Sequence, residues 1–260
     1  MKLVRPISAI TLPFLLSIGL FAMQRGGYSR YYSGGPSVPS EFYWSRLQYN
    51  TLYGGGGFRS YGGGWSQDYP QADNDCLIAL RRLTRINSPS PLNVADLDSD
   101  HLFDYPWVYA INVATWQFTD EEAKRLHDYL LKGGFLMVDH FHGTQDWTNF
   151  MAGMRQVLPD ATVEDLPDGD EIYHVLYDIN EKFQIPGEQY VRSGITYEKD
   201  GFVPKWRAIR DRHGRIMVAI CHNMHLGDAW EHADEAEYPE KFSGLAFRIV
   251  LNYITYSMTH

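Results

Sequence analysis

Two short polar segments hold most of the side chains that could do chemistry. They are DHFHG (139–143) and CHNMHLGD (221–228), and each directly follows an apolar run. Both segments combine imidazoles with a carboxylate. Neutral imidazoles and carboxylates are the usual protein ligands of zinc, iron and manganese, and they also serve as general acids and bases. The residue types therefore indicate a metal site, acid–base catalysis or a polar binding pocket.

A divalent metal site is the first hypothesis. The candidate ligands are Asp139, His142, His222 and Asp228. The sequence contains no compact signature such as HExxH, which would fix two ligands on one helix face. The alternative is that these imidazoles only form hydrogen bonds with backbone carbonyls and water.

Catalysis without a metal is the second hypothesis. Asp139 and His222 could act as an acid–base pair. Cys221 could act as a nucleophile at the end of its strand, with His142 or His225 as the base. The adjacent His222 is a poorer base for Cys221, because neighbouring side chains on a strand point to opposite faces. The plainer interpretation is that Cys221 and the other cysteine, Cys76, are buried thiols.

A binding pocket without turnover is the remaining hypothesis. Tryptophans near the two segments could form an aromatic wall beside polar anchors, as in sites for sugars or other polar ligands. Core packing is the commoner role of a tryptophan. The candidate ligand-binding residues are His140, His142, Asn112, Trp116, Asn223, His225 and Trp230.

The elements that must position these residues follow from the hydrophobic pattern. Continuous apolar runs at 106–112, 135–139 and 216–221 predict strands that are buried on both faces. Further strands are expected at 41–49, 93–97, 162–166 and 174–179, and helices at 73–86, 119–132, 145–159 and 241–260. Thr119 and Glu122 form a predicted capping box. Alternating strands and helices predict an α/β fold, a doubly wound, mostly parallel sheet with helices on both faces. Ligands of such sheets bind beyond the carboxyl ends of the strands, where both polar segments lie.

Composition limits the choice of partner. The chain has 260 residues and a net charge of −9. Residues 1–64 contain six basic residues and one acidic residue, so the remainder is more acidic than the total. An acidic body lacks the clustered Lys and Arg that nucleic-acid binding needs. The expected partner is a polar small molecule or a cell-envelope protein, with a divalent metal as the only cofactor indicated.

The N-terminal region predicts export. Lys2 and Arg5 precede an uncharged apolar run at 7–23, which is the layout of a secretory signal. Residues 1–24 are therefore interpreted as a signal peptide or, if uncleaved, an N-terminal anchor, and the protein as periplasmic or extracellular. Residues 25–40 form a Gly/Tyr-rich segment that is expected to be flexible. Residues 41–260 are the expected folded domain.

The ordered motifs also resemble a known family. The segments FYWSRLQYN, LFDYPWVYAIN, TDEEAKRLHDYLLKGGFLMVDHFHG, ICHNMHLGDAWE and NYITYSMTH are similar to those of a bacterial family catalogued as a domain of unknown function. The resemblance covers about residues 41–260. It implies membership of the class I glutamine amidotransferase-like superfamily and a flavodoxin-like α/β domain.

The resemblance does not carry over a glutaminase site. Active amidotransferases have a cysteine nucleophile at a strand–helix elbow, whereas Asp139 and His140 stand at this elbow here. The leading interpretation is an exported protein that binds a polar small molecule or an envelope partner at the His/Asp pocket. The alternative is a hydrolase, with or without a metal, that uses the same cluster.

Overall fold

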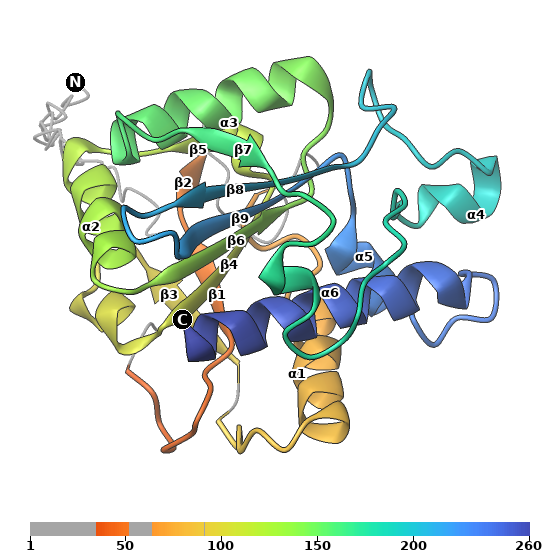
Figure 1. The fold of residues 1–260 in the computed structure, drawn as a ribbon, viewed down its shortest axis with the longest axis horizontal. Coiled ribbons are helices and arrows are strands. Elements are labelled where there is room, and N and C mark those ends of the chain that lie inside the picture. Colours follow the sequence, from red (N-terminus) through yellow and green to blue (C-terminus); the bar gives the residue numbers. More distant parts are fainter. Residues whose placement is uncertain (1–34, 52–63, 91) are drawn as a thin grey trace, which may run out of the picture.

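The computed structural model describes residues 35–51, 64–90 and 92–260 (Figure 1). The predicted signal or anchor, most of the Gly/Tyr-rich segment and most of the glycine-rich loop after the first strand lie outside these residues. No helix among the described residues is long and apolar enough to cross a membrane.

A seven-stranded, mostly parallel sheet forms the centre of the molecule. Its strand order is β3-β1-β4-β6-β9-β8-β7, and only β8 runs antiparallel to the other six strands. The strands are β1 (Ser45–Gln48), β3 (Asn93–Asp96), β4 (Trp107–Ile111), β6 (Phe135–Asp139), β7 (Val163–Asp165), β8 (Lys205–Arg210) and β9 (Ile216–His222). A separate antiparallel pair contains β2 (Asn50–Thr51) and β5 (Trp116–Gln117). In the sheet, β3 lies on one side of β1, whereas β4, β6 and β9 follow in order on its other side. This is the flavodoxin-like, doubly wound order.

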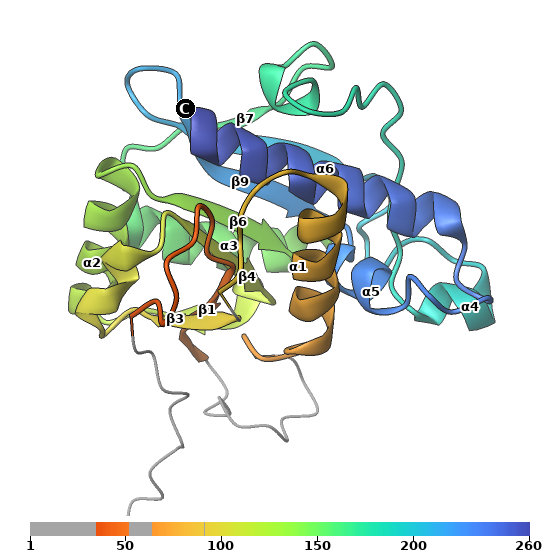
Figure 2. The same cartoon turned by 90° about the horizontal axis from the view of Figure 1, so that it is seen from below.

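Six α-helices cover both faces of the sheet. They are α1 (Gln71–Leu83), α2 (Asp120–Leu131), α3 (Gly143–Val157), α4 (Gln189–Ser193), α5 (Leu226–Glu231) and α6 (Glu240–Thr259). Short 3-10 helices η1 (Asp100–Asp104), η2 (Val113–Thr115) and η3 (Glu171–Tyr173) lie in the connections. Figures 1 and 2 show α1 and α6 on one face, with α3 on the other and α2 beside it.

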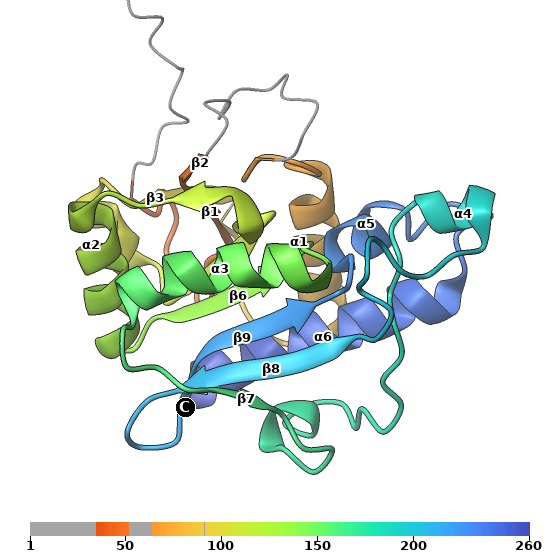
Figure 3. The same cartoon turned by 90° about the horizontal axis from the view of Figure 1, so that it is seen from above.

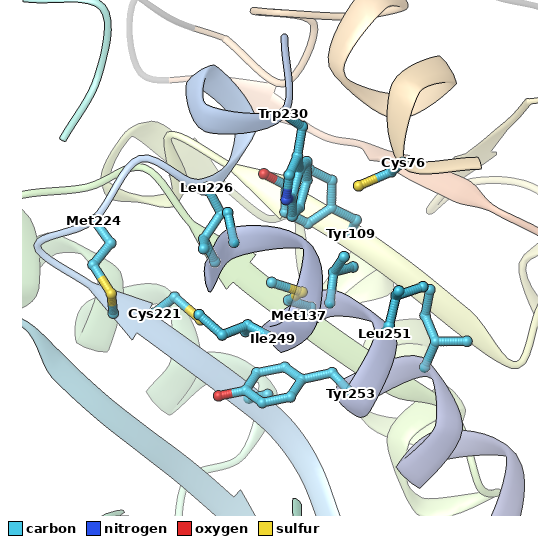
Figure 4. Close-up of a cluster of buried hydrophobic side chains, with 14 of the residues drawn as sticks. Cys76, Tyr109, Met137, Cys221, Met224, Leu226, Trp230, Ile249, Leu251 and Tyr253 are labelled. Atoms are coloured by element: carbon cyan, nitrogen blue, oxygen red, sulfur yellow. The ribbon is translucent and has the colours of Figure 1, made fainter. Parts of the chain in front are cut away.

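Two apolar clusters form the core, one on each face. Side chains alternate along a strand, so Tyr109 and Met137 pack toward α1, α5 and α6, whereas Ala110 and Val138 pack toward α2 and α3. Figure 4 shows the first cluster around α6, and Figure 3 shows α3 lying across the other face of the sheet. The predicted continuous apolar strands are confirmed at β4, β6 and β9, since every residue of each is buried.

The short elements α4, α5, β2 and β5 were not predicted. Two further segments also differ from the prediction. Residues 174–179 do not form a strand, because both backbone groups of Tyr177 bond to the side chain of Asn252 on α6. The strand β8 was not predicted, because its alternation of buried Trp206 and Ala208 with half-buried charged residues resembles an exposed segment. The capping box of Thr119 and Glu122 is confirmed at the start of α2.

Candidate functional site

A cluster of histidines and carboxylates lies beyond the carboxyl ends of β6 and β9. His140 follows β6, and His225 and Asp228 come from the start of α5, directly after β9. Two of these residues, His225 and Asp228, are three apart and therefore share a face of α5. Ligand atoms of His140, His225 and Asp228 all lie within 4.8 Å of one another. The parallel strands thus bring both polar sequence segments to one place, as predicted.

The distances within this group are too long for hydrogen bonds. Asp228 Oδ1 lies 3.6 Å from His225 Nδ1 and 3.9 Å from His140 Nδ1. On the other side, His140 Nδ1 lies 3.6 Å from Asp68 Oδ2, which comes from the segment before α1. His140 Nδ1, His225 Nδ1, Asp228 Oδ1 and Asp68 Oδ2 are buried and have no hydrogen-bond partner among the described residues. Buried polar atoms normally have partners, so four convergent exceptions indicate a ligand.

The second polar atom of His140, His225 and Asp228 contacts a neighbouring residue in each case. His225 Nε2 lies 2.9 Å from Glu198 Oε1, and Asp228 Oδ2 accepts a bond from the backbone N–H of Glu188. His140 Nε2 lies 3.4 Å from the amide of Gln67. Asn112 Nδ2 donates to Gln67 Oε1, so it is the amide nitrogen of Gln67 that faces His140 Nε2 and can donate to it. One polar atom of each side chain is therefore held by a neighbouring residue, while the atom that faces the centre of the cluster has no hydrogen-bond partner among the described residues.

The local charges favour a cation at the cluster. Burial alone would lower the pKa of His225, but Asp228 and Glu198 raise it to about 10. Burial would likewise raise the pKa of Asp228, but the facing His225 holds it well below its usual range. The two shifts have one cause: His225 carries a positive charge that the facing carboxylates stabilise. A metal ion that binds His225 Nδ1 must displace the proton there.

A second, overlapping group contains His142, Glu198 and His225. The His142 ring stacks on His225 at 4.3 Å between ring centres, and both of its nitrogens are buried without a partner among the described residues. Burial, together with the nearby positive charge of His225, lowers the pKa of His142 far below its usual range, so its ring is neutral. In this group, however, His225 Nε2 already bonds to Glu198. The first group therefore fits a metal better.

The backbone round the cluster is unusual. The non-glycine residues with positive φ among the described part of the chain are Asp68, Asn112, His140, Lys199 and Asn223. His140 is itself in the cluster, and Lys199 is adjacent to Glu198. Such conformations cost free energy and concentrate at functional sites.

A buried ion pair holds the segment that carries Asp68. Arg46 on β1 pairs with Asp73 on α1, and neither side chain is exposed. The same guanidinium donates to the backbone carbonyls of Trp65 and Gln67. Asp68 therefore follows a stretch of backbone that is fixed from the centre of the sheet.

Comparison with known families finds a match whose range includes the whole cluster. A family model described as "Domain of unknown function (DUF4159)" matches residues 45–258, which run from β1 to the end of α6. The chain belongs to this family. No curated protein matches it. The DUF4159 match includes Asp68, His140, Glu198, His225 and Asp228.

In this DUF4159 domain, Asp139 and His222 do not meet. Asp139 follows Met137 in the alternation of β6, and its Oδ2 accepts bonds from the backbone N–H groups of Leu226 and Gly227 and from Tyr109. His222 points to the opposite face, where it stacks on Phe141. Burial raises the pKa of Asp139 to about 6. The carboxylate thus fixes the start of α5 and does not pair with His222.

His222 and Asn223 both hold the start of α3. His222 Nε2 lies 3.1 Å from the carbonyl oxygen of Gly143, and Asn223 Oδ1 accepts a bond from the Gly143 N–H. Asn223 also donates to Val203 through its Nδ2. Both residues lie beside the cluster. His222 Nε2 and the amide group of Asn223 form hydrogen bonds with backbone atoms.

Three other predicted residues lie outside the cluster. Asn112 donates to the Gln67 amide and so supports the neighbour of His140. Trp230 packs on Trp44 and Tyr109 in the core. Trp116 packs on Phe150 and lines a different cavity.

The two cysteines are buried thiols. Cys221 is fully buried and belongs with Met137, Ile249 and Tyr253 to the cluster in Figure 4. Burial raises its pKa well above the usual range, so the reactive thiolate is disfavoured. Cys76 is buried in the same cluster.

Sequence reasoning did not single out Asp68 or Glu198 for the site. Asp68 lies far beyond the end of β1, and Glu198 lies far beyond the end of β7, so the rule about strand ends does not find them. Of the four predicted metal ligands, Asp228 is in the first group and His142 is in the second.

Proposed function

We propose that this chain binds one divalent transition-metal ion through His140 Nδ1, His225 Nδ1 and Asp228 Oδ1. Two imidazoles and one carboxylate are suitable ligands for Zn²⁺, Fe²⁺ or Mn²⁺. The observation that carries the proposal is that all three atoms are buried, converge and lack a hydrogen-bond partner among the described residues.

The spacing supports the proposal. Ligand atoms about 2.0–2.1 Å from a tetrahedral ion lie roughly 3.4 Å from one another. The separations of 3.6 and 3.9 Å at Asp228 Oδ1 need only small side-chain adjustments to reach this value. The Asp228 side chain as a whole is 14 % exposed, although its Oδ1 is buried.

Three protein ligands leave one position for a polar ligand. Asp68 lies near His140 but outside the group whose atoms are all within 4.8 Å of one another. Its free Oδ2 is thus better placed to accept a hydrogen bond from a metal-bound molecule than to bind the ion. We infer that the ion anchors a polar small molecule, in keeping with the predicted binding role.

A metal-dependent hydrolase is the second candidate. It is favoured by the same unpartnered Asp68 Oδ2, because a carboxylate beside a metal-bound water can take the proton of that water and so produce a hydroxide nucleophile. Asp68→Asn should then abolish hydrolysis of an activated ester such as p-nitrophenyl acetate while metal binding is retained.

The metal proposal is tested by stoichiometry. Metal-stripped full-length protein is titrated with Zn²⁺ against a chromogenic chelator, and one ion per chain is expected. His225→Ala and Asp228→Asn should each weaken binding by more than about 100-fold, because even loss of an outer partner of a ligand costs roughly 10–100-fold.

His101→Ala is the matched control. His101 also pairs with a carboxylate, Asp104, but both side chains are about half exposed. Its removal should leave Zn²⁺ affinity unchanged. Wild-type protein that binds no ion, or a His225→Ala variant that binds as tightly as wild type, would refute the metal site.

Export and superfamily also remain proposals. The signal-like residues 1–24 support an envelope location, and an envelope protein is the other partner to consider. The strand order supports the class I glutamine amidotransferase-like placement, although His140 and Asp139 stand at the elbow where a catalytic cysteine would be.

A further inference from the structure

A second cavity lies apart from the histidine cluster. It has a volume of about 440 Å³ and lies between the β2–β5 pair, the start of α2 and the second half of α3. None of its lining residues belongs to the proposed metal site. Its volume falls in the range of roughly 300–1,000 Å³ that is usual for small-molecule sites.

The lining of the cavity is polar, and both oxygens of its one charged side chain already accept hydrogen bonds from neighbouring residues. Four lining residues have amide side chains: Asn50, Gln117, Asn149 and Gln156. No Lys or Arg lines the cavity. The one carboxylate, Glu122, uses Oε1 to accept from Asn50 and Oε2 to accept from the Thr119 N–H. The lining therefore favours a neutral ligand that is rich in hydroxyl or amide groups.

Aromatic rings form the wall of the cavity. The rings of Trp116 and Phe118 lie 4.9 Å apart, and Phe118 is half-buried. Trp116 is only 4 % exposed, yet its Nε1 donor has no hydrogen-bond partner among the described residues. This nitrogen lies directly over Gly153, where a Cβ would come within 2.2 Å of it. The glycine thus makes room for the indole at the edge of the cavity.

We propose that this cavity binds a neutral saccharide of one or two rings. Sugar hydroxyls both donate and accept, which matches the amides, and the C–H faces of a sugar pack on aromatic rings. The proposal does not depend on the metal site, because the two sites share no residue.

The test is saturation-transfer NMR on the full chain. The probes are glucose, N-acetylglucosamine, maltose and cellobiose, each at about 5 mM, a concentration that detects millimolar dissociation constants. At least one probe should show transfer, and the signal should persist in EDTA and in His225→Ala. Ala152→Phe should reduce it at least about 10-fold, because Ala152 is exposed on α3 and lines the cavity.

Arg155→Phe is the control, since Arg155 is exposed on the same helix but does not line the cavity. It should retain the signal. A second variant, Asn149→Ala with Gln156→Ala, removes one half-buried and one exposed amide of the lining and should also lose binding. The proposal is overturned if no probe binds, if Ala152→Phe and the double variant both bind like wild type, or if EDTA removes the signal, which would place the sugar at the metal centre.

Discussion

At the scale of single residues, Glu198 determines which ring nitrogen of His225 can bind an ion, because it bonds to the other one. The pKa of His225 is raised to about 10 by the facing carboxylates, so the metal-free imidazole carries two protons and an ion must displace one of them. The bond between Nε2 and Glu198 Oε1 keeps the other proton on Nε2. The lone pair then lies on Nδ1, which faces Asp228 Oδ1. Glu198 is thus an outer partner of the proposed ligand and is 36 % exposed.

Glu198→Gln is therefore expected to weaken Zn²⁺ binding by roughly 10–100-fold without abolishing it. A chelator competition titration measures the change. Glu188→Gln is the matched control, since its side chain pairs with Arg192 at the surface and only its backbone N–H bonds to Asp228. Wild-type affinity in Glu198→Gln would contradict the outer role, and complete loss would instead make Glu198 a direct ligand.

The residues of the site could be predicted only in part. Both polar segments follow buried strands, so His140, His225 and Asp228 could be expected at one edge. The face to which each side chain points depends on packing, and this separates Asp139 from His222. Asp68 reaches the cluster through a turn held by Arg46, and no pattern in the sequence signals that contact.

At the scale of elements, His222 connects the end of β9 to the start of α3. Its Nε2 lies 3.1 Å from the Gly143 carbonyl oxygen, and its ring lies against Phe141 and Trp147. Burial lowers the pKa of His222 from 6.5 to about 4, with a small opposing contribution from the bond to Gly143. The folded protein therefore keeps this imidazole neutral at pH values where the unfolded chain binds a proton.

This difference predicts acid destabilisation. As pH falls from about 6.5 to about 4, the unfolded chain gains a proton that folded His222 does not, so the free energy of unfolding should fall by roughly 2–3 kcal/mol. Urea unfolding of metal-stripped protein at pH 7.5 and 4.5 measures it. His222→Gln can still donate to Gly143 and should lose correspondingly less stability on acidification. Equal losses in the two proteins would show that His222 does not contribute.

The elements themselves were predicted where the pattern reflects burial on both faces. β4, β6 and β9 are continuous apolar runs, and the core surrounds them. The capping box of α2 depends only on residues that are close in sequence, so it was also predicted correctly. In contrast, the fate of residues 174–179 is decided by Asn252, which is about 75 residues away in sequence and bonds to Tyr177. A local pattern cannot contain that information.

At the scale of the whole molecule, the proposed centre joins parts of the chain that are far apart in sequence. His140 ends β6, while His225 and Asp228 begin α5, and α5 packs against both α1 and α6. In sequence, His140 is separated from His225 and Asp228 by more than 80 positions, so a site of this geometry exists only in the folded state. An ion that binds only the folded state stabilises it by mass action.

Metal removal is therefore expected to lower the melting temperature of the whole domain. At a free Zn²⁺ concentration 100 times the dissociation constant, the stabilisation is about 2.7 kcal/mol. For a domain of this size, that corresponds to a shift of roughly 5–10 °C. Differential scanning fluorimetry with Zn²⁺ and then with EDTA measures the shift, and His225→Ala should melt at the same temperature in both conditions. A shift of equal size in His225→Ala would mean that Zn²⁺ acts elsewhere on the protein, because that variant lacks the one imidazole shared by both possible ligand groups.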